Sequence, residues 1–185
     1  VVFTEGDPGS SLLLISSGLV AVQVPGAGGS SITVAIRGPG EMLGEMALFA
    51  RSGRRTATAV ARAATRFLEL DSASFESLRT ARPEIDDLFL RILAERSASL
   101  TWRLAESGEL DPTVRLARRI LDLPTGGEPG APVPVTVEDL AGLSGISVQL
   151  VADRLYDLQQ LGWIDVADGV AILDRPALTR AASLP

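Results

Sequence analysis

The spacing of the hydrophobic residues changes near Asp71, and this change constrains the fold more than any other feature of the sequence. Before this point, apolar and β-branched residues form short runs separated by turns rich in Gly, Pro and Ser. After it, apolar residues recur at helical spacing over longer stretches. Runs of the first kind are typical of strands and runs of the second kind of helices. We therefore expect an α+β protein in which β structure comes first.

Five short segments in the first part of the chain are expected to be strands. They cover residues 12–15, 19–24, 31–36, 58–61 and 66–70. Strands spaced at about 8–12 residues are typical of a sandwich, jelly roll or barrel. The glycine cluster at 26–29 is expected to be a hairpin turn rather than a phosphate-binding loop, because no helix follows it. Residues 1–80 are thus predicted to form a β-roll of the jelly-roll type.

A long helix is predicted from Pro83 to about residue 106, within the segment 81–110. Proline suits a first helical turn, and the acidic residues that follow it complement the positive end of the helix dipole. Apolar residues occupy more than one stripe of this helix, so it should pack on its own β domain and on a second surface. We expect that surface to be the same helix of a second subunit, giving a homodimer through residues 83–106. A core helix of a larger monomer is the alternative.

Residues 111–185 are expected to form a winged helix-turn-helix. Thr136 is placed to cap a first helix at 137–143, and Ser147 to cap a second that ends near Leu161. Two short apolar segments around Asp168-Gly169 then predict a hairpin. A helix, a tight turn, a longer helix and a hairpin in this order indicate a helix-turn-helix with a wing.

Composition excludes many classes of enzyme. The chain has no Cys, no His and no Lys, so all 17 basic residues are Arg. Thiolate and histidine metal sites, Ser-His-Asp triads, lysine Schiff bases and lysine-containing phosphate loops are therefore excluded. We expect no metal and no enzymatic activity; a metal-free enzyme that uses Glu41 and Glu45 is a weaker alternative. The sequence lacks a membrane-length apolar run and a secretion signal, which predicts a cytoplasmic protein without a membrane partner.

One stretch between the third and fourth expected strands carries recognisable chemistry. Gly44 permits unusual backbone angles or the close approach of a ligand, and Glu45 offers a carboxylate to a sugar hydroxyl. About ten residues later, Arg55 supplies a planar guanidinium suited to the paired oxygens of a phosphate. Thr56 adds a hydroxyl, and Ala57 keeps the wall small. Together they suit a ribose joined to a phosphodiester; the alternative is a surface Glu–Arg pair beside a hairpin.

These motifs resemble those of the Crp–Fnr family of bacterial transcription factors. The matching residues are Gly44-Glu45-Met46-Ala47, Arg55-Thr56-Ala57, Phe3-Thr4-Glu5-Gly6-Asp7 and Gly18. The resemblance covers almost the whole chain and implies that the β-roll lacks an N-terminal segment usual in the family. It implies a homodimeric cyclic-nucleotide-binding regulator that binds double-stranded DNA through its winged helix, and it allows RNA polymerase as a further partner.

The resemblance also implies roles for single residues in ligand binding. Gly44, Met46 and Ala47 would lie along the ribose-phosphate wall with Ala57, Glu45 would take the ribose 2′-hydroxyl, and Arg55 and Thr56 would hold the cyclic phosphate. The base would be met by the long helix near Arg96, Leu100 and Thr101. Family members that bind cyclic AMP often carry Thr-Ser at the position of Leu100-Thr101. Cyclic AMP is the expected ligand, and cyclic GMP is the alternative.

The DNA-reading helix departs from the family pattern, in which Ser-Arg-Glu is followed by a second Arg. Here the corresponding residues are Ser147, Val148 and Gln149, with Asp153 at the position of the second Arg and Arg154 next to it. Gln149 can still read adenine. Ser147 and Thr136 can contact phosphate.

The charge of the C-terminal segment leaves a second hypothesis open. Residues 111–185 carry ten acidic and six basic side chains, whereas a DNA-binding domain usually presents a basic face. Arg115, Arg118 and Arg119 are the nearest further cations. The alternative function is therefore a nucleotide-sensing protein-interaction module whose winged helix does not read DNA.

Overall fold

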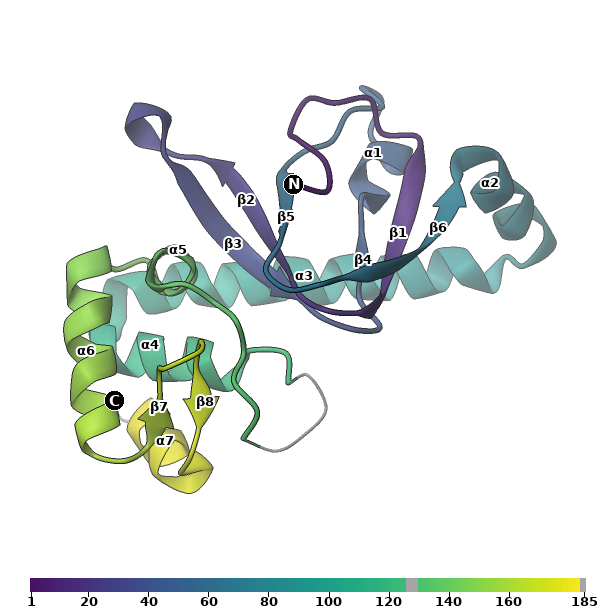
Figure 1. The fold of residues 1–185 in the computed structure, drawn as a ribbon. Coiled ribbons are helices and arrows are strands. Elements are labelled where there is room, and N and C mark those ends of the chain that lie inside the picture. Colours follow the sequence, from purple (N-terminus) through teal and green to yellow (C-terminus); the bar gives the residue numbers. More distant parts are fainter. Residues whose placement is uncertain (126–129, 184–185) are drawn as a thin grey trace.

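The computed structural model describes residues 1–125 and 130–183 (Figure 1). A β-roll lies along one side of a long helix. A mainly helical domain lies near the C-terminal end of that helix. The expected order of strands, long helix and winged helix is observed. The mixed α+β class predicted from the sequence is confirmed.

The β-roll consists of two three-stranded antiparallel sheets. One sheet has the order β4-β1-β6 and comprises β1 (Ser11–Ser17), β4 (Met42–Leu43) and β6 (Arg66–Asp71). The other has the order β3-β2-β5 and comprises β2 (Val20–Pro25), β3 (Ser31–Arg37) and β5 (Thr58–Ala61). A core that includes Ile15, Val20 and Leu43 is buried in the roll. The hairpin predicted at the glycine cluster joins β2 to β3, with a short 3₁₀ turn at Ala27–Gly29.

Two short helices of the β-roll domain pack against the long helix that follows them. Helix α1 (Glu45–Phe49) follows β4, and α2 (Ser72–Ala81) follows β6, with Asp71 as its N-cap. The rings of Phe49, Phe75 and Phe89 pack with centroids 5.2–5.7 Å apart, so they hold both short helices against the long helix.

The long helix α3 spans Glu84–Glu109, close to the predicted limits. It buries Phe89 against the roll. Much of its remaining surface is apolar and exposed, at Leu88, Leu90, Leu100, Trp102 and Leu104. Among residues 1–125 and 130–183, no helix has both the length and the apolar character needed to cross a membrane.

The C-terminal domain has the elements of a winged helix. It contains α4 (Pro112–Leu121), α5 (Val137–Ser144), α6 (Val148–Gln160), β7 (Ile164–Asp165), β8 (Ala171–Ile172) and α7 (Arg175–Ala182). Thr136 and Ser147 cap α5 and α6 as predicted, and Asp139 completes a capping box with Thr136. Helix α7 was not anticipated from the sequence.

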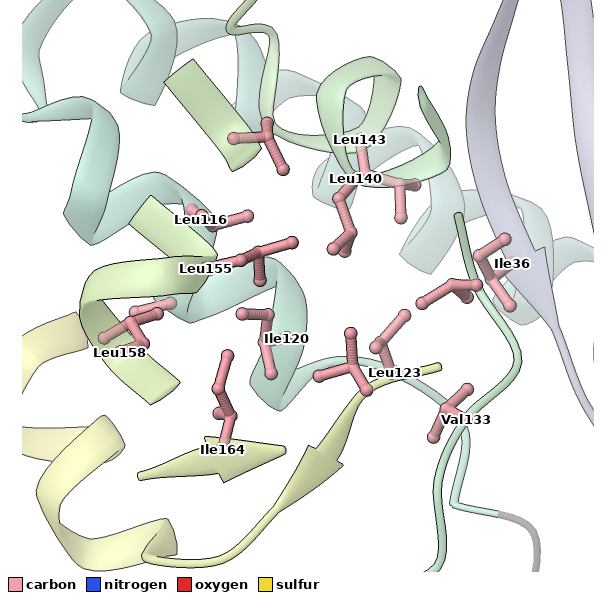
Figure 2. Close-up of a cluster of buried hydrophobic side chains, with 14 of the residues drawn as sticks. Ile36, Leu116, Ile120, Leu123, Val133, Leu140, Leu143, Leu155, Leu158 and Ile164 are labelled. Carbon is pink, nitrogen blue, oxygen red and sulfur yellow. The ribbon is translucent and has the colours of Figure 1, made fainter. Parts of the chain in front are cut away.

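The largest hydrophobic core belongs to the C-terminal domain but extends into the roll. Leu116, Ile120, Leu140 and Leu155 are buried at its centre. Ile36 of strand β3 joins the same cluster, as Figure 2 shows. The sheet β3-β2-β5 therefore packs directly against the winged helix.

Candidate functional site

A small cavity of about 100 Å³ lies between α1, the loop before β5 and helix α3. All seven cassette residues predicted from the sequence line it: Gly44, Glu45, Met46, Ala47, Arg55, Thr56 and Ala57. Phe3, Met42 and Arg96 also contribute to its wall. The predicted carboxylate and guanidinium thus share one cavity, which does not fit the alternative of a surface pair beside a hairpin.

Arg55 is buried and tightly held. Its Nη1 donates to the backbone carbonyl oxygens of Ser11 at 2.8 Å and Gly44 at 3.1 Å, and its Nη2 donates to the Ser11 hydroxyl at 3.3 Å. The guanidinium carbon lies 4.4 Å from the centroid of the Phe3 ring. The Nε atom is buried without a hydrogen-bond partner among the described residues. Arg55 therefore has a fixed position and an unused donor.

The charge of Arg55 is only partly compensated. Burial lowers the pKa of its guanidinium, while Glu69, Asp7 and Glu45 act in the opposite direction through their charges. A buried cation with incomplete compensation favours the binding of an anion.

Gly44 is required for this geometry because of its left-handed backbone conformation and its lack of a side chain. It caps α1 in the left-handed region, with a φ of 82°. A Cβ atom built at Gly44 would lie 2.0 Å from the Nη1 of Arg55. Any side chain here would displace the guanidinium.

Glu45 is 4% exposed and lies in the first turn of α1. Its carboxylate forms an ion pair with Nη1 of Arg96, and Nη2 of Arg96 donates to the carbonyl oxygen of Met42 at 3.0 Å. Arg96 thereby ties the cassette to α3. The sequence predicted Arg96 near the base of a ligand but gave no sign of this pair.

A second cavity of about 480 Å³ lies between strands β2 and β3 and helix α3. It shares Val22, Arg37, Met42 and Arg96 with the small cavity, so the two adjoin. Leu100, which the resemblance placed near the base of a ligand, lines this cavity. Thr101 is on the exposed side of α3 and its hydroxyl donates to the Ser97 carbonyl oxygen at 3.0 Å, so the single chain does not bring it into either cavity.

The predicted DNA-reading residues lie at the exposed start of α6. Ser147 accepts from the Leu150 amide at 3.3 Å, and Val148 is exposed. The Gln149 side-chain amide donates to Asp153 at 3.0 Å.

Three other arginines of the C-terminal domain form ion pairs with carboxylates. Arg154 pairs with Asp157 at 2.7 Å. Arg118 and Arg119 both pair with Glu106 near the end of α3. Thr136 is exposed beside the first turn of α5.

Two residues that hold Arg55 in place were missed or underused by the sequence interpretation. Ser11 fixes Arg55 through its carbonyl and hydroxyl oxygens, yet it sits in a strand with no motif around it. Phe3 was recognised only as part of a motif, and its ring proves to stack on the guanidinium.

A cavity that combines a carboxylate and an arginine, joined by a long helix to a winged helix, defines a ligand-responsive DNA-binding regulator. Two family models match the chain: the cyclic nucleotide-binding domain over residues 1–82 and the Crp-like helix-turn-helix domain over residues 114–181.

Known proteins agree with both matches. The CRP-like cAMP-activated global transcriptional regulator of Mycobacterium tuberculosis is 34% identical, over 98% of this chain and 84% of its own length. The cyclic AMP receptor protein of Thermus thermophilus is 30% identical, over 96% and 81%. The solved structure of the c-di-GMP responsive regulator CLP from Xanthomonas campestris superposes with a TM-score of 0.68 at 25% identity, covering 93% of this chain and 88% of that one.

The chain belongs to the Crp–Fnr family of transcriptional regulators. The recognition made from the sequence is confirmed, as are the β-roll, long helix and winged helix-turn-helix. The match to the Crp-like helix-turn-helix favours a DNA-binding regulator over the alternative of a protein-interaction module.

Proposed function

We propose that this regulator binds cyclic AMP in the two adjoining cavities and that binding controls its affinity for DNA. Two relatives are named for cyclic AMP, which supports this choice. Cyclic GMP is the alternative, because Leu100 cannot donate or accept a hydrogen bond at the base and Thr56 offers a hydroxyl to a guanine in the syn conformation. The proposal includes no metal and no catalytic step.

The convergence of Glu45 and Arg55 on one cavity is the observation that carries this proposal. Arg55 would hold the cyclic phosphate together with Thr56. Glu45 would accept a hydrogen bond from the ribose 2′-hydroxyl. Gly44, Met46, Ala47 and Ala57 would form the wall against the sugar and phosphate.

The base would occupy the larger cavity against α3. Arg96 and Leu100 line that cavity and are the residues we propose for base contact. The contact predicted for Thr101 stays a prediction, since its side chain faces away from the cavity of its own chain.

We further propose a homodimer through α3, with domains at 1–80, 81–110 and 111–185. Leu90, Leu93, Ser97, Leu100 and Leu104 follow one another at alternating spacings of three and four residues. This spacing is that of a coiled-coil seam. Most of these side chains are exposed in the single chain, as a dimer face requires.

On the DNA side, α6 would enter the major groove. Val148 suits a thymine methyl group and Gln149 suits adenine. Thr136, Ser147 and Arg154 would contact the phosphate backbone. Such a regulator acts in the cytoplasm, where RNA polymerase is a further partner in the proposal.

Calorimetric titration of the purified protein with cyclic AMP and with cyclic GMP tests the ligand. Arg55→Ala should remove measurable binding, while Arg54→Ala, which changes an exposed neighbour outside the cavity, should leave the affinity unchanged. Unchanged affinity in Arg55→Ala would refute the pocket assignment. A mobility-shift assay with and without the nucleotide then tests control of DNA binding.

A further inference from the structure

Asp139 of α5 is fully buried at the contact between the winged helix and the β-roll. Its Oδ1 accepts from the Thr33 hydroxyl at 2.7 Å and from Nη2 of Arg62 at 2.6 Å. Its Oδ2 accepts from the Thr136 amide at 3.0 Å, in the capping box of α5. One carboxylate therefore joins the start of the first helix of the helix-turn-helix to two segments of the β-roll.

Gly142 brings the backbone of α5 close to strand β3. A Cβ atom built at Gly142 would lie 2.5 Å from the carbonyl oxygen and 2.7 Å from the nitrogen of Thr33. These are backbone atoms, which cannot rotate away as a flexible side chain can. The two domains thus dock only because position 142 lacks a side chain.

The strand that receives α5 also forms the wall of the larger cavity. Val34 lines that cavity, and its carbonyl oxygen accepts from Arg103 of α3 at 2.9 Å. Thr33, its neighbour in β3, points the opposite way and bonds to Asp139. The β3-β2-β5 sheet is therefore in contact with the proposed nucleotide site on one face and with the winged helix on the other.

We propose that Thr33, Arg62 and Asp139 form a latch that couples occupancy of the nucleotide cavity to the position of the winged helix. A ligand that shifts β3 changes the distances within the latch. Because a buried carboxylate is costly without its partners, these distances determine how stable the docked arrangement is. By reciprocity, movement of the winged helix on DNA changes the affinity for the nucleotide by the same factor. This inference rests on the proposed function, because the ligand of the latch is the cyclic nucleotide proposed there.

Three variants are expected to weaken these contacts by different means. Gly142→Ala should wedge α5 away from β3 while favouring the helix itself, because Ala has the higher helix propensity. Thr33→Val removes one hydrogen bond to Asp139 with little change in shape. Arg62→Lys is the conservative variant and should retain coupling through its charge, whereas Arg62→Leu should not. Arg66→Leu, at an exposed arginine of β6, is the matched control.

The first measurement needs no nucleotide. Amide hydrogen exchange followed by mass spectrometry should show faster exchange at residues 31–37 and 137–144 in Gly142→Ala than in wild type. Thermal unfolding shows whether the variant remains folded. Unchanged exchange in a folded Gly142→Ala would overturn the docking on which the latch depends, whatever the ligand proves to be.

The second measurement is the ratio of DNA affinities with and without cyclic AMP. In Gly142→Ala, Thr33→Val and Arg62→Leu, we expect this ratio to move toward one by about fivefold or more. Calorimetry should show that intrinsic cyclic AMP binding persists. A ratio equal to that of wild type in all three variants would overturn the latch. No effect of cyclic AMP on wild type would instead refute the proposed function and leave the exchange result to decide the docking.

Discussion

Glu45 and Arg96, which are 51 residues apart in the sequence, form an ion pair that joins the first turn of α1 to the middle of α3. Glu45 is the group proposed to receive the ribose, and Arg96 is proposed to meet the base. A nucleotide that bonds to both would therefore act on the contact between the β-roll and the helix of the proposed dimer.

Glu45→Gln should reduce discrimination between ribose and deoxyribose. In wild type, cyclic AMP should bind more tightly than 2′-deoxy cyclic AMP by about 10- to 100-fold, the range for a hydrogen bond to a charged group. A neutral amide makes a weaker bond, so the two affinities should converge in the variant. Calorimetry with both ligands measures the ratio, which a general loss of stability would not change. A ratio as large as that of wild type contradicts the assigned role of Glu45.

Gly44→Ala should strongly weaken nucleotide binding, because the new Cβ atom would collide with the Arg55 guanidinium. Gly53→Ala is the matched control. Gly53 also has a positive φ, 57°, but a Cβ atom there would meet nothing within 4 Å. Both variants carry backbone strain, so only the collision separates them. Equal losses of affinity in the two titrations would count against the geometry of the cassette.

Leu104→Glu should convert the dimer to a monomer. Leu104 is 76% exposed in the single chain, so a charge costs little there, but it would be buried at the seam of a dimer. Sedimentation equilibrium measures the molar mass. Leu68→Glu changes an exposed leucine of β6 outside α3 and should leave the dimer intact. A monomeric wild type, or a dimeric Leu104→Glu, would show that α3 is not the interface.

DNA binding should depend weakly on salt. Arg118, Arg119 and Arg154 of the C-terminal domain are paired with carboxylates, so we expect a slope of log affinity against log salt well below the magnitude of about 10 known for the lac repressor. Asp153→Arg should steepen the slope by about one for each subunit, because it replaces a negative charge with a positive charge on the helix proposed to enter the groove. Fluorescence anisotropy between low and moderate salt measures both slopes. Asp87→Arg, far from α6 in the sequence and on another helix, should have no such effect.

Local signals in the sequence predicted most of the fold. Pro83 and the acidic residues after it placed the start of α3 within one residue, and the capping residues Thr136 and Ser147 placed α5 and α6. Strand β4 has two residues and therefore no period to detect. Helix α7 was missed although Asp174 caps it and Pro176 lies in its first turn, because the sequence interpretation did not use these two start signals.

The sequence predicted which residues make up the candidate site but not the ion pairs and hydrogen bonds between them. The cassette is contiguous in sequence, so its residue types are visible there. The ion pair of Glu45 with Arg96 and the bond of Thr33 to Asp139 join segments 51 and 106 residues apart, and only tertiary packing brings them together. The same reason explains why Ser11 was missed as the group that holds Arg55.

The docking of α5 on β3 also bears on solubility. Strand β3 is the outer strand of its sheet and pairs only with β2 among the named strands. Uncovered outer strands pair readily with those of other molecules. A variant that frees the winged helix, such as Gly142→Ala, would leave this strand open to a second molecule, and concentrated solutions of it should aggregate sooner than wild type.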